Sequence, residues 1–290
     1  MKVTLWGTRG SLASPGPETA RYGGNTSCVE VRAADGTTLV LDAGTGLRRL
    51  SAALPTGLRR IDLLLTHLHM DHIQGLGFFA PLRQPGLDVH IWGPTSATHD
   101  LHTRLTRYLS PPLFPVHLRD LECHLSLHEV AHDDFQIGPF LVSSTFVCHP
   151  DPTLGYRIQE GNAVVVYLPD HEPALGMRGI PFDPHWTSGQ ALATGADLLI
   201  HDAQYTDEEY EERIGWGHTA ISDAVRFAAA AGVQQLVPFH HDPTHSDDDL
   251  DRFFVAARAC APPNLRVTPA TEGATFTLGA SRGLQTPPGA

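Results

Sequence analysis

Short runs of hydrophobic residues, many of them alternating with polar ones, recur along the chain and predict many strands. Such runs occupy residues 3–6, 28–32, 38–42, 61–65, 89–92, 140–144, 146–148, 156–158, 163–168, 198–201 and 236–239. Apolar positions at helical spacing, with flanking turn residues, predict helices at residues 44–54, 75–82, 95–109, 221–231 and 247–260. Both halves of the chain run from strands to a helix. This order predicts an α/β fold in which two sheets pack face to face with helices outside.

The first three predicted strands follow one another with only turn residues between them, so they are expected to form a meander and not a β-α-β unit. We expect residues 1–280 to form a single domain. Residues 281–290 are small, polar and proline-rich, and we expect them to be a disordered tail.

Composition narrows the class of protein. The formal net charge is −12, and Lys2 is the only lysine, which argues against binding to an extended nucleic acid. A small anionic substrate remains compatible with this charge. No apolar run approaches the length of a membrane span, the N-terminus does not resemble a signal peptide, and the 4 cysteines show no C-x-x-C pair. We therefore expect a cytoplasmic protein with no membrane partner.

The stretch from residue 61 to residue 75 carries the densest candidate chemistry. Its apolar run at residues 61–65 predicts a strand that is buried on both faces. Directly after this strand come the side chains of His67, His69, Asp71 and His72. Polar groups beside a core strand are costly unless they bind something. Imidazole and carboxylate groups suit divalent zinc, manganese or iron, so we predict a metal site here.

The spacing H-x-H-x-D-H resembles the signature of the metallo-β-lactamase superfamily. The resemblance implies the αββα sandwich of that family and two divalent metal ions. It also implies that His67 and His69 bind the first ion and that Asp71 and His72 bind the second. Zinc or manganese is expected, and iron also suits these ligands.

The remaining metal ligands are expected at the ends of later strands. In the family a third histidine of the first metal sits at such a strand end, and His149 follows the strand at residues 146–148. Asp170, after the strand at residues 163–168, resembles the carboxylate that bridges the two metals. His171 and Glu172 are its neighbours, and we prefer Asp170 because it comes first after the strand.

Two further assignments keep an alternative. The last ligand is expected at the end of the strand at residues 236–239, where the register favours His240 and leaves His241 as the alternate. Asp42 precedes a Gly-Thr-Gly sequence and resembles a family carboxylate that holds the ligand loop. An Asp42 that caps the following helix is equally consistent with the sequence.

Segments 198–205 and 215–220 resemble the ribonuclease Z branch of the family. In that branch an acidic residue and a histidine form a dyad beside the metals, which implies this role for Asp202 and His218. A carboxylate fixes the tautomer of an imidazole and keeps it cationic for proton donation. The long glycine-rich and basic insertion with which ribonuclease Z grips transfer RNA is not evident in this sequence.

These observations lead to a hypothesis of a dinuclear metal-dependent phosphodiesterase that acts on small phosphodiesters, with 3′,5′-cyclic AMP or GMP as the expected class. A hydroxide bridging the metals attacks phosphorus, His218 donates a proton to the leaving oxygen, and Asp71 counts among the catalytic residues as well as the ligands. The alternatives are a tRNA 3′-processing endoribonuclease, a carboxyl-ester or lactone hydrolase, and a non-catalytic metal-binding protein. The family resemblance also suggests a homodimer.

Overall fold

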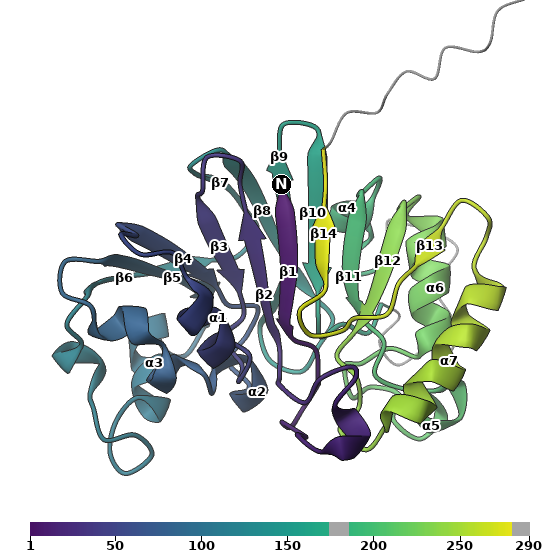
Figure 1. Ribbon diagram of the computed structural model, residues 1–290, viewed down its shortest axis with the longest axis horizontal. Coiled ribbons are helices and arrows are strands. Elements are labelled where there is room, and N and C mark those ends of the chain that lie inside the picture. Colours follow the sequence, from purple (N-terminus) through teal and green to yellow (C-terminus); the bar gives the residue numbers. More distant parts are fainter. Residues whose placement is uncertain (174–185, 280–290) are drawn as a thin grey trace, which may run out of the picture.

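Two mixed β-sheets lie face to face at the centre of the molecule (Figure 1). The computed structural model describes residues 1–173 and 186–279, and within these ranges each sheet has 7 strands. The first sheet contains, in spatial order, β14 (Thr275–Thr277), β1 (Lys2–Gly7), β2 (Cys28–Arg32), β3 (Thr38–Leu41), β4 (Arg60–Leu64), β5 (Asp88–Pro94) and β6 (His124–Val130). The second contains β13 (Arg266–Val267), β12 (Gln235–Phe239), β11 (Leu198–Asp202), β10 (Ala163–Leu168), β9 (Thr153–Glu160), β8 (Phe140–Val147) and β7 (Asp133–Ile137).

Each sheet joins an antiparallel part to a parallel part. β14, β1, β2 and β3 pair antiparallel, which agrees with the predicted meander, and β3 to β6 pair parallel. In the second sheet β7 to β10 pair antiparallel and β10 to β13 pair parallel. The carboxyl ends of β3, β4, β8, β10, β11 and β12 therefore meet at one edge of the sandwich, where loops can bring side chains from both sheets together.

Helices cover the outer faces of the two sheets. The α-helices are α1 (Leu47–Ala53), α2 (Met70–Ile73), α3 (Leu101–Tyr108), α4 (Gln190–Ala193), α5 (Asp207–Glu211), α6 (Ile221–Ala230) and α7 (Asp247–Cys260). Short 3-10 helices are η1 (Pro17–Thr19), η2 (Leu76–Phe78), η3 (Ala80–Arg83) and η4 (Leu118–Asp120). α1 and α3 lie on one side of the sheets, and α6 and α7 lie on the other (Figure 1). The predicted arrangement of two sheets with helices outside is confirmed.

Hydrophobic clusters fill the spaces between these layers. Val3 and Val237 belong to the cluster between the two sheets. Leu47 of α1 and Leu105 of α3 pack on the first sheet, and Phe227 of α6 packs on the second. Within the described ranges, none of the helices combines the length and the apolar character needed to cross a bilayer.

Several predicted elements differ from the structure. The helix predicted at residues 75–82 is replaced by η2 and η3. Gly75 packs against the chain before α1, where an added Cβ would lie 2.1 Å from the Gly44 carbonyl oxygen, and Pro81 removes a backbone donor. The helix predicted at residues 95–109 begins only at Leu101, because the Asp100 side chain accepts a hydrogen bond from the Thr103 amide at 2.7 Å and caps it there.

Other differences concern strands and loops. The two strands predicted at residues 140–144 and 146–148 form the single strand β8. Edge strands β6 and β7 were not predicted. Each has only a short apolar alternation, Leu125 and Leu127 in β6 and Phe135 and Ile137 in β7, among polar and partly exposed positions. Most of the loop expected at residues 171–190 and the tail expected at residues 281–290 lie outside the described residues.

Candidate metal centre

The loop after β4 turns its polar side chains into the edge where the two sheets meet. His67 lies three residues after the end of β4 and is buried, and Asp71 and His72 are buried on the short helix α2. His69, in extended conformation, precedes that helix. The close spacing of these residues in the sequence places all of them at the carboxyl end of one strand.

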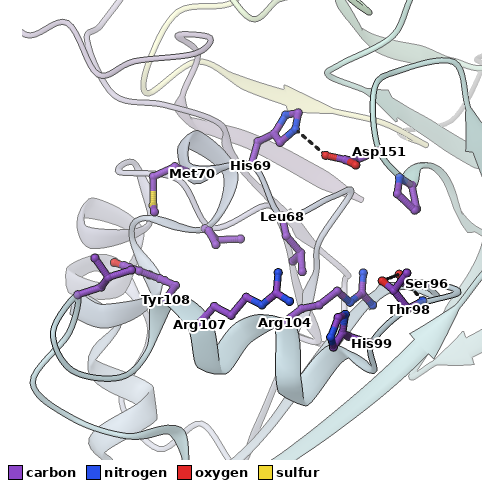
Figure 2. Close-up of a pocket in the computed structure, with 13 residues that line it drawn as sticks. Leu68, His69, Met70, Ser96, Thr98, His99, Arg104, Arg107, Tyr108 and Asp151 are labelled. Atoms are coloured by element: carbon purple, nitrogen blue, oxygen red, sulfur yellow. Dashed lines mark hydrogen bonds and ion pairs between the residues drawn. The ribbon is translucent and has the colours of Figure 1, made fainter.

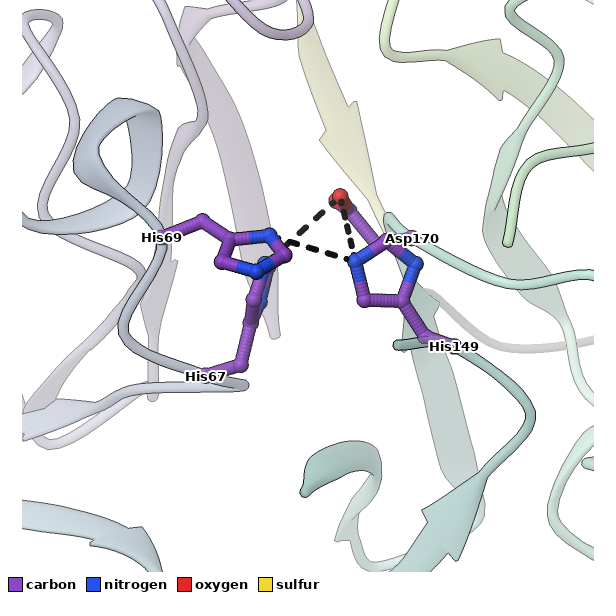
Figure 3. Close-up of side chains that lie close together, drawn as sticks. All are labelled: His67, His69, His149 and Asp170. Carbon is purple, nitrogen blue, oxygen red and sulfur yellow. Dashed lines mark hydrogen bonds and ion pairs between the residues drawn. The ribbon is translucent and has the colours of Figure 1, made fainter. Parts of the chain in front are cut away.

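A first cluster combines two residues of this loop with two from the second sheet (Figure 3). One ligand atom each from His67, His69, His149 and Asp170 lies within 4.8 Å of the others. Nε2 of His149 is 3.3 Å from Nδ1 of His69. Nε2 of His67 and Nε2 of His149 are each 3.7 Å from Oδ2 of Asp170.

A second cluster lies on the other side of Asp170 and consists of Asp71, His72, Asp170 and His240. Oδ1 of Asp170 is 2.9 Å from Nε2 of His72 and 3.2 Å from Nε2 of His240. The same His240 nitrogen is 3.2 Å from Oδ2 of Asp71. Asp170 thus directs one carboxylate oxygen to each cluster.

The donor atoms of these clusters fit divalent cations. Nε2 of His67 is buried and makes no hydrogen bond. Nε2 of His72 and Oδ1 of Asp170 are also buried and, although they lie 2.9 Å apart, have no partner in hydrogen-bond geometry. A buried polar atom without a partner is costly in a folded protein. Imidazole nitrogen and carboxylate oxygen are the ligands that zinc, manganese and iron accept, so bound cations would satisfy these atoms.

Electrostatics keeps most of these donors in the form that binds metal. Burial lowers the pKa of His67 well below its usual value and also lowers that of His149, so both imidazoles are neutral at pH 7. Burial alone would favour the neutral acid at Asp170, but the neighbouring His240 and His72 hold the pKa of its carboxyl well below the usual range. Neutral imidazoles beside an ionised carboxylate are ready for a cation.

Asp42 holds a ligand of the second cluster from behind. Its Oδ2 lies 2.7 Å from Nδ1 of His72 and accepts a hydrogen bond of 3.0 Å from the hydroxyl of Tyr167. Its Oδ1 accepts a hydrogen bond of 2.8 Å from the Thr66 amide. The helix that follows has Gly46 at its cap position and no side-chain cap. Of the two roles open for Asp42, the structure shows contact with the ligand loop.

The structure also places the alternates for the last ligand and the bridging residue. His241 turns away from the clusters and donates from Nε2 to the Ala270 carbonyl oxygen at 2.8 Å. His240 has a positive φ of 63°, which turns its ring toward Asp71 and Asp170. His171 contacts His201, with 2.9 Å between Nδ1 and Nε2.

Glu172, the other neighbour of Asp170, holds the loop at residues 215–217. Its carboxylate accepts hydrogen bonds from the Gly215 amide at 2.9 Å and the Gly217 amide at 2.8 Å. It also accepts a bond of 2.7 Å from the hydroxyl of Tyr210. His149 contacts the carbonyl oxygen of Gly217 through Nδ1 at 2.9 Å, so this loop orients one of the cluster histidines.

Asp202 and His218 form a hydrogen-bonded pair beside the second cluster. Oδ2 of Asp202 lies 2.7 Å from Nδ1 of His218. The ring of His218 stacks on that of His240 with 5.0 Å between centroids. Burial lowers the pKa of His218, but the charge and hydrogen bond of Asp202 outweigh it and raise the pKa to about 9. His218 is therefore a buried cation at neutral pH.

Asp202, His218 and His240 also lie close enough together to suggest a metal site. Hydrogen bonds already occupy the atoms involved, because Nδ1 of His218 contacts Asp202 and Nδ1 of His240 contacts Oε1 of Gln204 at 2.8 Å. These hydrogen-bonded atoms are therefore not free to bind a third cation.

Several contributors to the site were not predicted from the sequence. Tyr167 contacts Asp42, Gln204 contacts His240, and the Ser11 amide donates to Oδ2 of Asp71 at 2.8 Å. Tyr167 lies inside a strand that reads as core, and its place three residues before Asp170 is the only signal for it. Gln204 lies within the segment at residues 198–205 that resembles the ribonuclease Z branch, but that resemblance assigns it no role. Ser11 lies far in the sequence from all of the candidate metal ligands.

A pocket of about 380 Å³ opens beside His69 (Figure 2). Its lining includes Asp151 and three side chains of α3, namely Arg104, Arg107 and Tyr108. Because His69 belongs to the first cluster, a molecule in this pocket would lie directly beside the metal centre.

Comparisons with known proteins give one family match and several relatives. Residues 37–241 match the Beta-lactamase superfamily domain. Ribonuclease Z of Mycolicibacterium gilvum is 30% identical over 270 residues, covering 84% of this chain and 85% of that protein. Ribonuclease Z of Gemmatimonas aurantiaca is 26% identical over 261 residues, covering 75% of this chain and 80% of that protein. The crystal structure of the metallo-beta-lactamase fold protein YhfI from Bacillus subtilis has a TM-score of 0.67 at 23% identity, over 96% of this chain and 98% of that one.

Proposed function

The chain belongs to the beta-lactamase superfamily as a ribonuclease Z-like metal-dependent hydrolase, and from this premise we propose that it is a dinuclear phosphodiesterase for small phosphodiesters. The expected class is 3′,5′-cyclic nucleotides. The observation that carries the proposal is the Asp202–His218 pair, 2.7 Å apart, beside two His/Asp clusters that share Asp170. Phosphodiester cleavage needs both parts, a place for cations and a proton donor for the leaving oxygen.

The clusters assign a set of residues to each cation. His67, His69 and His149 would hold one divalent ion, with Asp170 between the two sites. The ligands of the other ion would be Asp71, His72 and His240. Divalent ions bound there supply Lewis acidity toward a phosphoryl oxygen and lower the pKa of bound water toward neutrality.

The protein's own groups supply the proton. His218 lies 5.1 Å from His149 and 5.0 Å from His240 between ring centroids, so its ring faces the space between the clusters. Asp202 contacts Nδ1 and so leaves Nε2 to donate to the leaving oxygen. The remaining oxygen of Asp202 accepts a bond of 2.9 Å from the Thr219 amide, which fixes the carboxylate in this orientation.

A second candidate is a tRNA 3′-processing endoribonuclease. It is supported by the relatives named ribonuclease Z, one of them 30% identical. Against it stand the net charge of −12 and the short connection from His149 to Asp170, which holds only β9 and β10 and no basic insertion. Long phosphate backbones are bound by clustered Lys and Arg. A carboxyl-ester or lactone hydrolase would use the same cations but would have less use for His218.

A substrate screen tests the proposal. The protein, reconstituted with zinc or manganese, is assayed on 3′,5′-cyclic AMP and GMP, bis(p-nitrophenyl) phosphate, a lactone and a pre-tRNA. We expect turnover of the small phosphodiesters, lowered roughly 10²–10⁴-fold on the cyclic nucleotides in His218→Ala, the usual range for a lost general acid. The metal content of the variant should equal that of the wild type.

His124→Ala is the matched control, because the side chain of this exposed histidine on β6 pairs with Asp88 and belongs to neither cluster. A His218→Ala variant with full activity on cyclic nucleotides would remove the residue from the mechanism. Cleavage of pre-tRNA without turnover of any small phosphodiester would replace the proposal by its second candidate.

A further inference from the structure

The pocket beside His69 has walls of two kinds (Figure 2). Leu68, Met70 and Leu113 contribute apolar side chains, and α3 contributes two guanidinium groups. Its volume of about 380 Å³ is in the range of sites for small molecules and is too small for a folded macromolecule. The pocket therefore suits a substituent of a small substrate whose reacting part lies at the metal centre.

The two arginines of the pocket differ in their partners. Positions 104 and 107 are one helical turn apart, so both side chains leave α3 on the same face, toward His69 (Figure 2). The Arg104 side chain is only 14% exposed and is held by Glu129 at 3.1 Å and by the Pro94 carbonyl oxygen. Arg107 is exposed, and within the described ranges it has no ion pair and no side-chain hydrogen bond.

Arg107 is thus an uncompensated cation in a concave site of a protein with a net charge of −12. The carboxylate of the pocket, Asp151, lies across from α3 and within 3.5 Å of Nε2 of His69. Asp151 makes the side of the pocket next to His69 negative, and the arginines of α3 make the opposite side positive. An anion would be repelled from the His69 wall and attracted to the wall formed by α3.

We propose that this pocket binds a second phosphate group of the substrate, a phosphate monoester carried on the substituent that stays attached to the scissile phosphorus, and that Arg107 binds it. This inference rests on the proposed phosphodiesterase function and adds to the cyclic nucleotides a second class of substrate, small phosphodiesters that carry an additional phosphate. A guanidinium group matches two phosphate oxygens at once, which a lysine does not.

The position of His218 decides which substituent reaches the pocket. The rings of His69 and His218 each lie 5.1 Å from the ring of His149 between centroids, and the pocket lining includes His69 but not His218. The leaving oxygen faces His218, the proton donor. The substituent retained on phosphorus is then the one that extends past His69 toward Arg107.

A matched pair of substrates tests the inference. The p-nitrophenyl ester of thymidine 5′-phosphate is compared with the same ester carrying a 3′-phosphate, because p-nitrophenol leaves and thymidine is retained. We expect kcat/KM to be roughly 10–100-fold higher for the ester with the 3′-phosphate, the usual effect of a charge-assisted hydrogen-bonded contact. In Arg107→Gln this ratio should fall close to one, and Arg107→Lys should retain part of it.

Arg48→Gln is the control for loss of charge alone, since Arg48 is exposed on α1 and is not part of the pocket. It should keep both the activity and the ratio. A ratio that stays unchanged in Arg107→Gln, or that is close to one in the wild type, would overturn the inference while the phosphodiesterase function stands.

A binding measurement tests the inferred phosphate site independently of the proposed phosphodiesterase activity. Calorimetry with thymidine 3′,5′-bisphosphate and thymidine 5′-monophosphate, on metal-loaded and metal-free protein, should show tighter binding of the bisphosphate that is lost in Arg107→Gln. If neither ester is hydrolysed but this difference is found, the phosphate site stands and the phosphodiesterase function fails. Equal binding of the two nucleotides would overturn the site.

Discussion

At the scale of single residues, the contact between Asp202 and His218 determines how activity depends on pH. The pKa of His218, lowered by burial but raised more strongly by Asp202, is about 9. The proton to be donated is present below this pKa and is lost as pH rises through it. We expect kcat on a cyclic nucleotide to fall at alkaline pH. In Asp202→Asn the fall should begin at lower pH, because the charge that retains the proton is gone.

A substrate with p-nitrophenol as leaving group is the control for this pH profile, because that leaving group departs without a proton. Its alkaline limb should be weak in the wild type and in His218→Ala. If the cyclic nucleotide gives the same alkaline limb in His218→Ala as in the wild type, another group is responsible for it.

Asp42 is a second residue that influences the site through a neighbouring side chain. Its contact with Nδ1 of His72, 2.7 Å long, directs Nε2 of that ring toward Asp170. Asp42→Asn should weaken binding of the second metal ion by about 10–100-fold, as is usual for groups that orient a ligand. Metal titration followed by elemental analysis measures this. Asp62→Asn is the control, because Asp62 is equally buried on β4 but pairs with Arg60.

Residue positions could be predicted from the sequence where they depend on local spacing. The four candidate ligands of the loop after β4 lie within one motif, and the structure brings them together with His149, Asp170 and His240 at the ends of other strands. His240 and His241 could not be separated, because their difference lies in the backbone conformation of one residue, a φ of 63° at His240. Contacts such as Tyr167 to Asp42 span 125 residues and leave no local pattern.

At the scale of elements, the loop at residues 215–217 connects two parts of the site. Glu172 anchors it through two backbone amides and the hydroxyl of Tyr210, and the Gly217 carbonyl oxygen contacts His149. An added Cβ at Gly217 would lie 2.4 Å from Nδ1 of His149, so the loop and the ring are in close contact. The loop therefore positions His149 on one side and leads into His218 on the other.

Glu172→Gln should release this loop. A carboxylate accepts all three hydrogen bonds, whereas the amide group of glutamine would face a backbone amide with another donor. We expect about 1–3 kcal/mol less stability in thermal or urea unfolding, from donors left unsatisfied in the interior. The value of kcat should also fall, with metal content retained. Glu208→Gln, on the exposed face of α5, should change neither quantity.

Helices and strands that several features of the sequence indicate were predicted well, whereas those indicated by a single feature were not. Helix α7 was predicted with its observed bounds, because three acidic residues begin it and a capping box formed by Ser246 and Asp249 marks its start. The segment at residues 75–82 had turn residues at its end but no cap at its start, and backbone packing of Gly75 decided its conformation. Edge strands β6 and β7 carry only two alternating apolar residues each, Leu125 and Leu127 in β6 and Phe135 and Ile137 in β7, and were not predicted.

At the scale of the whole molecule, the order of strands and helices predicted the layers and the meander of the first three strands, but not the pairing of strands distant in the sequence. β14 pairs with β1, with Lys2 opposite Thr277, so the beginning and the end of the described chain share one sheet. Such pairing depends on packing over the full length of the chain, which no local pattern encodes. The two candidate metal clusters depend on this level of organisation, since each combines residues that follow strands of both sheets.

Metal removal should therefore lower the stability of the molecule as well as its activity. The loop after β4 belongs to the first sheet, while His149, Asp170 and His240 follow strands of the second. Cations bound between them favour the folded state by about 4 kcal/mol when their free concentration is a thousandfold above Kd. For a chain of this size this corresponds to a decrease in Tm on the order of 10 °C after chelation.

Differential scanning calorimetry with and without EDTA measures the decrease. It should shrink in Asp170→Asn, which loses the carboxylate shared by both clusters, and persist in Asp134→Asn on the exposed strand β7. An unchanged Tm after complete metal removal, verified by elemental analysis, would show that the two sheets hold this edge together without cations.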